Sequence, residues 1–177
     1  MKNCLIVALP RSGSTNLLFS ISKRNKLKGL FEPFHKSPNI YSRYHKNTVC
    51  KMIIYRLEME ELINFSKNFE KVVILSRRDL VAATESFVAM RLDNHSNSLT
   101  VWNEVSDFNK KHIPYFTDKM TDWSNSLEDL SKRIGINIDY YEDVYSNKSL
   151  QDKDIKLDLE YFDPIRKLRG KKASVVI

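Results

Sequence analysis

Cysteine and glycine are scarce in this sequence, and a long apolar run is missing. The 177 residues include two cysteines, Cys4 and Cys50, and both lie in apolar stretches typical of strands. We therefore expect small buried side chains there, rather than a disulfide or a metal site. No apolar stretch approaches the roughly 20 residues of a membrane-spanning helix, and the apolar run after Asn3 is too short for a secretion signal. These absences predict a soluble, cytoplasmic protein with no membrane contact.

Repeats, low-complexity segments and linkers rich in proline or glycine are also missing. The length and the 42% of hydrophobic residues suit a single domain over residues 1–177 with a sizeable core, in which the charged tail from about Ser146 is only partly ordered. The 29 basic residues exceed the 22 acidic ones, which gives a net charge of +7 and favours an anionic ligand. Because the basic residues are spread along the chain, they argue against nucleic acid as the partner. The oligomeric state stays open.

Strand-like apolar runs alternate with segments of helical periodicity. Strands are expected at residues 5–9, 30–31, 49–55, 72–75 and 136–141, and helices at 14–23, 58–69, 80–92 and 98–134, the last broken at Pro114. This alternation predicts an α/β fold, a three-layer sandwich with a central parallel sheet. In such sheets ligands bind at the carboxyl ends of the strands. We expect the segments after the first, second and fourth strands to converge on one crevice.

The segment after the first strand has the composition of an anion-binding turn. Pro10 lacks an N–H group and ends the strand, and Gly13 permits a positive φ and a close approach of a ligand to the backbone. Ser14 or Thr15 can cap the helix that follows. The free N–H groups and the positive dipole end of that helix suit an anion.

The ATP-type loop, G-x-x-x-x-G-K-[ST], fits this segment only in part. Ala8 stands at its first glycine, and Ser14 replaces the lysine that reaches the β- and γ-phosphates. Arg11 supplies a positive charge from inside the loop instead. One guanidinium among several hydroxyls suits a terminal 5′-phosphate or phosphosulfate better than a triphosphate with Mg²⁺. A surface turn rich in serine and glycine is the simpler alternative.

The stretch from Leu9 to Thr15 resembles the 5′-phosphosulfate loop of sulfotransferases that use 3′-phosphoadenosine 5′-phosphosulfate (PAPS). Cytosolic members carry Pro-Lys-Ser-Gly-Thr there and carbohydrate-type members carry Arg-Ser-Gly-Ser, which is the form in this chain. The resemblance implies a P-loop-like phosphosulfate-binding loop, PAPS as donor, 3′-phosphoadenosine 5′-phosphate (PAP) as product, and no metal. It assigns donor binding to Pro10, Arg11, Ser12, Gly13, Ser14, Thr15 and Asn16.

A second stretch resembles the segment of these sulfotransferases that binds the 3′-phosphate. Family members follow a buried strand with an arginine and place a serine eight residues later, a spacing that Arg78 and Ser86 reproduce, although Leu80 stands where proline is usual. Eight residues are about two helical turns, so Ser86 returns to the side of the helix start. Taken alone, Arg78 could as well form a surface pair with Asp79 or Glu85.

Sulfuryl transfer also requires stabilisation of the leaving phosphate and a base for the acceptor hydroxyl. Arg11 can stabilise the leaving phosphate and the sulfuryl oxygens. Glu32 lies in a Glu-Pro segment that resembles one in carbohydrate-type members, where an acidic residue can act as the base, and His35 is the substitute. The structural alternatives are a capping or surface carboxylate for Glu32 and an exposed loop histidine for His35.

Three further features resemble the family more weakly. Lys51 could contact the sulfuryl group, although a strand-edge charge is the simpler interpretation. Arg77 is a weaker candidate than Arg78 for the 3′-phosphate, with a surface charge as the alternative. Residues 139–144 are similar to a Tyr-Glu-Asp-Leu segment, which we expect to be structural. Arg169 and Gly170 resemble a C-terminal loop that closes over the 3′-phosphate, with a solvated basic tail as the alternative.

The sequence therefore predicts a PAPS-dependent sulfotransferase that acts on the hydroxyl of a glycan or another small molecule. Glu32 would be the base and Arg11 the stabilising cation. Two alternatives stay open. One is a nucleotide kinase or NTPase of the same sheet class, which lacks the lysine expected after Gly13. The other is a relative that binds the nucleotide without catalysis.

Overall fold

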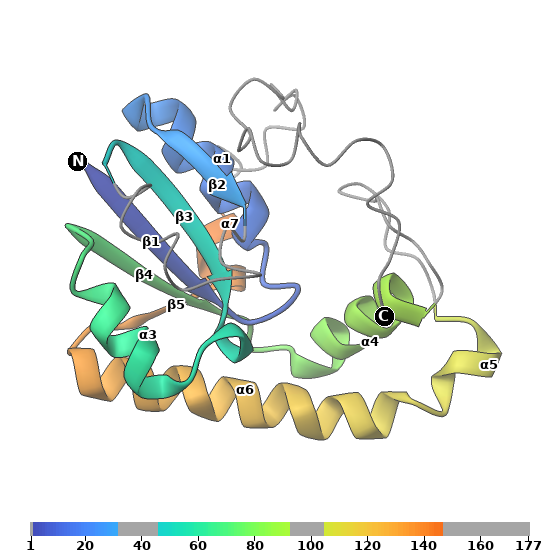
Figure 1. The fold of residues 1–177 in the computed structure, drawn as a ribbon. Coiled ribbons are helices and arrows are strands. Elements are labelled where there is room, and N and C mark those ends of the chain that lie inside the picture. Colours follow the sequence, from blue (N-terminus) through green and yellow to red (C-terminus); the bar gives the residue numbers. More distant parts are fainter. Residues whose placement is uncertain (1, 32–45, 93–104, 147–177) are drawn as a thin grey trace, which may run out of the picture.

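Strands and helices alternate along the chain. The computed structural model describes residues 2–31, 46–92 and 105–146 (Figure 1). Its elements in order are β1 (Asn3–Ala8), α1 (Ser14–Asn25), β2 (Lys28–Phe31), β3 (Thr48–Ile53), the 3₁₀ helix η2 (Ile54–Arg56), α3 (Met59–Ser66), β4 (Lys71–Ser76), α4 (Leu80–Leu92), α5 (Asp107–Lys110), α6 (Ile113–Ile134), β5 (Ile138–Tyr140) and α7 (Tyr141–Ser146).

The strands of the described residues form one parallel sheet in the order β2-β3-β1-β4-β5. The central strand, β1, pairs with β3 on one side and β4 on the other, so that Leu5 lies opposite Cys50 and Val72. All six residues of β1 are buried, as expected for a parallel strand covered on both faces. The predicted α/β class and parallel sheet are confirmed.

Alternate side chains of β1 pack into two separate cores. Cys4, Ile6 and Ala8 belong to a cluster with Leu18 of α1. Leu5 and Val7 belong to a second cluster whose helical members come from α3, α4 and α6. Helices thus lie on both faces of the sheet, consistent with the predicted three-layer sandwich (Figure 1).

The chain leaves β1 and β4 toward opposite faces of the sheet. The connection after β1 passes through α1 to β2, whereas β4 is followed by α4, which packs with α6 on the other face. Neighbouring parallel strands whose connections diverge in this way open a crevice at their carboxyl ends. We call the region between the segments after β1 and β4 the crevice; the segment after β2, which was also expected there, lies outside the described residues.

Several element boundaries differ from the predictions. The strand expected at residues 49–55 ends at Ile53, because Ile54–Arg56 form η2. The break expected at Pro114 is present, since α5 ends at Lys110 and α6 begins at Ile113. Pro114 occupies the first turn of α6, where its missing N–H group costs no hydrogen bond. The last strand ends at Tyr140, and the residues from Tyr141 form α7. The tail from residue 147 lies outside the described residues.

No helix in the described part of the chain is long and apolar enough to cross a membrane. The two cysteines, Cys4 and Cys50, are both buried and form no disulfide, as predicted. Burial raises the pKa of the Cys4 thiol to about 11, although nearby Lys71 acts to lower it. Cys4 therefore stays protonated in the folded protein at neutral pH.

Replacing Leu127 on α6 tests the core between α6 and the sheet. The side chain is fully buried, so Leu127→Ala should lower the free energy of unfolding by about 2–5 kcal/mol in urea titration. Val81→Ala is the control, because Val81 is 57% exposed and its truncation should change stability by no more than about 0.5 kcal/mol. Equal effects of the two substitutions would contradict the described core.

Candidate anion-binding site

The β1–α1 loop (residues 9–13) turns the chain sharply at the end of the central strand. Leu9 still donates its N–H to Leu75 O at 2.9 Å, which extends the pairing with β4 by one residue. Arg11 and Gly13 then adopt positive φ values of 61° and 74°. Gly13 occupies the N-cap position of α1 without a side-chain cap. The prediction that Ser14 or Thr15 caps the helix is therefore wrong, because Ser14 is already its first residue.

Three carbonyl groups of the β1–α1 loop accept hydrogen bonds from protein side chains. Ser12 Oγ donates to Leu9 O at 2.7 Å, and Arg77 Nη1 donates to Arg11 O at 3.5 Å. Tyr145 Oη donates to Gly13 O at 2.6 Å. Carbonyl oxygens repel an anion, whereas free N–H groups at a helix start attract one. With these three carbonyl oxygens bonded to protein groups, the loop is chemically compatible with an anion at the start of α1.

Arg11 joins the loop to α4 on the other side of the crevice. Its Nε donates to Ser86 Oγ at 2.8 Å, and its Nη1 lies 3.6 Å from Met90 Sδ. Among the described residues, Arg11 forms no ion pair with a carboxylate. Desolvation first, and the charge of Arg77 second, lower the pKa of Arg11. A partly buried cation beside another cation is stabilised by any anion that binds next to it.

A third cation lies at the start of α1. Lys51 Nζ donates to Thr15 Oγ1 at 3.2 Å, and Lys51 is 4% exposed. The interpretation of Lys51 as a strand-edge charge is wrong, because β3 lies between β2 and β1 and the side chain is buried against α1. Arg11, Arg77 and Lys51 together give the loop a positive surrounding.

The β4–α4 turn (residues 77–79) is held by two carboxylates of α7. Glu142 accepts the backbone N–H groups of Arg78 and Asp79 at 3.0–3.2 Å. Asp143 accepts both terminal nitrogens of Arg78, at 2.7 and 2.5 Å. Desolvation acts to raise the pKa of Glu142, but the backbone N–H donors and Arg77 outweigh it and lower the pKa. Glu142 is therefore a stable anion at neutral pH.

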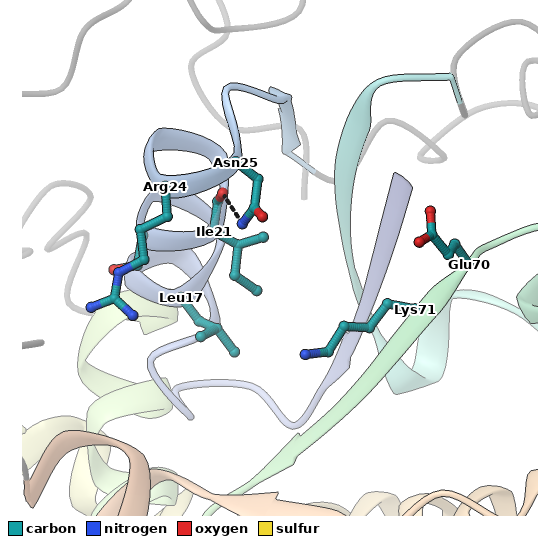
Figure 2. A pocket seen from close by; sticks show the side chains of 7 residues that line it. Leu17, Ile21, Arg24, Asn25, Glu70 and Lys71 are labelled. Atoms are coloured by element: carbon teal, nitrogen blue, oxygen red, sulfur yellow. Dashed lines mark hydrogen bonds between the residues drawn. The ribbon is translucent and has the colours of Figure 1, made fainter. Parts of the chain in front are cut away.

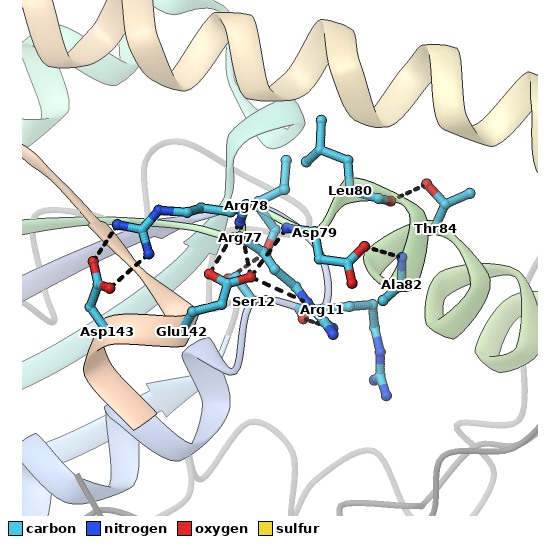
Figure 3. Close-up of polar contacts among 11 residues, drawn as sticks. Arg11, Ser12, Arg77, Arg78, Asp79, Leu80, Ala82, Thr84, Glu142 and Asp143 are labelled. Atoms are coloured by element: carbon cyan, nitrogen blue, oxygen red, sulfur yellow. Dashed lines mark hydrogen bonds and ion pairs between the residues drawn. The ribbon is translucent and has the colours of Figure 1, made fainter. Parts of the chain in front are cut away.

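Arg77, and not Arg78, is the buried arginine of this turn. Arg77 is 7% exposed, with Nε 4.0 Å from Glu142 and the guanidinium 5.0 Å from the centre of the Tyr141 ring. The alternative that Arg77 is a surface charge is therefore wrong. The side chain of Arg78 is 52% exposed and lies over the Tyr140 ring. Figure 3 shows the Arg78 guanidinium directed toward Asp143, whereas the Arg11 guanidinium points away from Asp143.

The structure brings some of the predicted site residues together and separates others. Arg11 and Ser86 are in direct contact, whereas Arg78 bonds to Asp143 rather than to Ser86, Asp79 or Glu85. Ser12 and Ser14 are buried, so Ser12 shapes the loop rather than facing solvent. Pro10 is buried, and Gly13, Thr15 and Asn16 are partly exposed. Four predicted residues lie outside the described residues: Glu32, His35, Arg169 and Gly170.

Sequence reasoning missed the contribution of α7. Tyr141 and Tyr145 stack with ring centres 4.7 Å apart and cover Gly13. Their spacing of four residues places two aromatic rings on one face of a helix, which was the available signal. The strand predicted at residues 136–141 instead ends at Tyr141, and no predicted element includes Tyr145.

A pocket of about 540 Å³ lies apart from the crevice (Figure 2). It is bounded by α1 and by the residues at the amino end of β4. Its lining residues are Leu17, Ser20, Ile21, Arg24, Asn25, Glu70 and Lys71. The β1–α1 loop follows the opposite, carboxyl end of the sheet, so this pocket contains none of the site residues described above.

No protein-family model matches this chain, and no curated protein sequence matches it either.

Substitution of Gly13 tests the close packing of α7 on the loop. A Cβ at Gly13 would lie 2.7 Å from a Tyr145 ring carbon and 2.9 Å from a Tyr141 ring carbon. Gly13→Ala should lower the free energy of unfolding by about 1–2 kcal/mol for the positive φ and by about 1–3 kcal/mol more for the ring displacement.

Gly135→Ala is the matched control for this experiment. Gly135 has a similar φ of 69°, but nothing lies within 4 Å of its added Cβ. It should lose only the backbone contribution, about 1–2 kcal/mol by urea titration. A loss at Gly13 no larger than the loss at Gly135 would contradict the packing of α7 against the loop.

Proposed function

We propose that this protein is a PAPS-dependent sulfotransferase whose donor spans the crevice between the β1–α1 loop and α4. The observation that carries the proposal is the hydrogen bond from Arg11 to Ser86. It joins the two segments that resemble the two phosphate-binding segments of these enzymes. It also leaves a partly buried guanidinium without a carboxylate partner among the described residues. Both features suit a ligand with an anionic group at each end.

The 5′ end of the donor would bind at the β1–α1 loop, acting as a P-loop-like phosphosulfate loop. The loop carbonyls are already hydrogen-bonded to protein side chains, and the first N–H groups of α1 have no side-chain cap. The N–H groups of Ser14 and Thr15, with Arg11 beside them, would contact the phosphosulfate oxygens. Ser14 supplies no ammonium group, which favours this donor over a nucleoside triphosphate.

The 3′-phosphate would bind at Ser86 and the start of α4. Ser86 Oγ accepts from Arg11 and can still donate to a phosphate oxygen. Arg78 would join it by exchanging Asp143 for the phosphate, since the exposed pair with Asp143 contributes little stability. A 3′-phosphate carries more charge than one carboxylate, which favours this exchange.

The reaction would transfer the sulfuryl group in one displacement. The acceptor oxygen forms a bond to sulfur as its proton passes to a base, and the bond from sulfur to the bridging 5′-phosphate oxygen breaks to release PAP. Arg11 and the loop N–H groups would stabilise the charge that develops on that phosphate. Glu32 is the proposed base and His35 its substitute. β2, which directly precedes Glu32 in the sequence, ends at the same edge of the parallel sheet as β1.

The acceptor is proposed to be the hydroxyl of a glycan or of another small molecule. The excess of basic residues, which gives a net charge of +7, would attract an anionic acceptor as well as the donor. A cytoplasmic location stays a prediction from the sequence.

Calorimetric titration of the purified protein with PAP and with AMP tests donor recognition. The wild type should bind PAP at least tenfold more tightly than AMP, because only PAP reaches Ser86 and Arg78. Arg11→Gln removes a charge-assisted contact and should weaken PAP binding by about 10- to 100-fold.

Arg133→Gln is the matched control, because Arg133 forms exposed ion pairs with Glu60 and Asp129 on α3 and α6, away from the crevice. It should leave PAP affinity within about twofold, since exposed pairs contribute little. Equal affinity of the wild type for PAP and AMP would refute the proposed function. Magnesium-dependent ATP hydrolysis would support the kinase or NTPase alternative instead.

Replacing Glu32 separates binding from chemistry. Glu32→Gln keeps the size of the side chain but removes the base, so sulfate transfer from radiolabelled PAPS should fall by about 10²- to 10⁴-fold. PAP affinity should stay within about threefold of the wild type, since the base contacts the acceptor rather than the nucleotide. A screen of glycans and phenols supplies the acceptor for this assay. If His35→Asn removes turnover and Glu32→Gln does not, the base is His35.

A further inference from the structure

Helix α7 contacts both sides of the crevice although it belongs to neither. Tyr145 donates its hydroxyl to Gly13 O in the β1–α1 loop. Three residues earlier on the same helix, Glu142 accepts two N–H groups of the β4–α4 turn on the other side. A short helix that follows the edge strand β5 thus bonds to the backbone of both segments.

We propose that α7 sets the spacing between the β1–α1 loop and the β4–α4 turn, and that Tyr145 and Glu142 are its positioning residues. The inference rests on the proposed function, because the spacing matters only for a ligand that binds both segments. Neither residue needs to touch the nucleotide. Each acts through backbone groups that fix where the binding groups lie.

Tyr145 makes a directional hydrogen bond to the loop in addition to its ring contact with Gly13. Tyr145 is 7% exposed, and burial raises its pKa above the ordinary value, so the hydroxyl remains a proton donor. Its acceptor, Gly13 O, also receives the N–H of Leu17 at 3.2 Å. The hydroxyl therefore fixes the carbonyl at the point where the loop becomes α1.

The contact of Glu142 with the turn is equally directed. Both carboxylate oxygens accept the N–H of Arg78, and one also accepts the N–H of Asp79. Glu142 thereby holds the backbone N–H groups of the turn that precedes α4, while Asp79 Oδ1 accepts the N–H of Ala82 within that helix. The carboxylate also lies near Arg77, which donates to Arg11 O in the loop. Through Arg77, Glu142 is connected to the same loop as Tyr145.

The ratio of AMP to PAP dissociation constants measures this positioning. AMP would contact only the loop, whereas PAP would bridge both segments. A change in their spacing therefore weakens PAP more than AMP, whereas a general loss of folded protein weakens both by the same factor. A substitution that only lowers the fraction of folded protein therefore leaves the ratio of the two dissociation constants unchanged.

Tyr145→Phe keeps the ring on Gly13 and removes only the hydroxyl. It should lower the ratio of AMP to PAP dissociation constants about fivefold in calorimetric titration, the effect of one lost hydrogen bond. Glu142→Gln should lower the ratio by a similar factor. Tyr141→Phe is the control on the same helix, since no hydrogen bond of its hydroxyl exists within the described residues, and it should keep the ratio within about twofold.

The outcomes separate the two proposals. A wild type without preference for PAP over AMP refutes the proposed function and this inference with it. A wild type that prefers PAP, with a ratio unchanged in both Tyr145→Phe and Glu142→Gln, refutes the positioning role alone. A tighter binding of PAP by Glu142→Gln would also overturn it, because the carboxylate would then compete with the ligand rather than position its site.

Discussion

The guanidinium of Arg11 is partly buried and has no carboxylate partner within the described residues. Its uncompensated positive charge is the feature on which the proposed site depends. Arg11 bonds to a hydroxyl and a thioether, and the nearby charge of Arg77 opposes its own. Holding such a group out of water costs free energy that a bound anion would offset. The positive φ of Arg11 adds strain of the kind that concentrates at functional sites. Strain and charge at the same residue therefore both favour a ligand-binding role over a surface turn.

The sheet topology explains why this arginine meets a serine from a distant part of the chain. β1 and β4 are neighbours, and the chain leaves them toward opposite faces. The loop after β1 and the start of α4 consequently face each other across the crevice. Helix α7 follows the edge strand β5 and joins the two segments: Tyr145 and Glu142 bond to backbone groups, and Asp143 bonds to the side chain of Arg78. The groups that would bind the donor and the α7 side chains that hold them in place thus come from different elements. The N–H groups at the start of α1 have no side-chain cap.

The sequence predicted what depends on local pattern and missed what depends on distant contacts. The apolar run of β1 and the positive φ of Gly13 follow from neighbouring residues, and both are confirmed. The hydrogen bond between Arg11 and Ser86 joins residues 75 positions apart. The sequence pattern predicted only that their two segments lie at the same edge of the sheet. The sequence offered Asp79 or Glu85 as the ion-pair partner of Arg78. The partner is Asp143, because α7 lies beside the turn in space. Lys51 was misjudged because its position depends on the strand order, which sequence alone does not give.

A crystal structure of the protein in complex with PAP tests the central claim most directly. The account predicts one nucleotide across the carboxyl ends of β1 and β4, with its 5′-phosphate on the N–H groups at the start of α1 and on Arg11. Its 3′-phosphate should lie within hydrogen-bond distance of Ser86 Oγ. A nucleotide bound elsewhere, such as in the pocket between α1 and the amino end of β4, would contradict the account. So would a nucleotide that contacts the loop while its 3′-phosphate points into solvent.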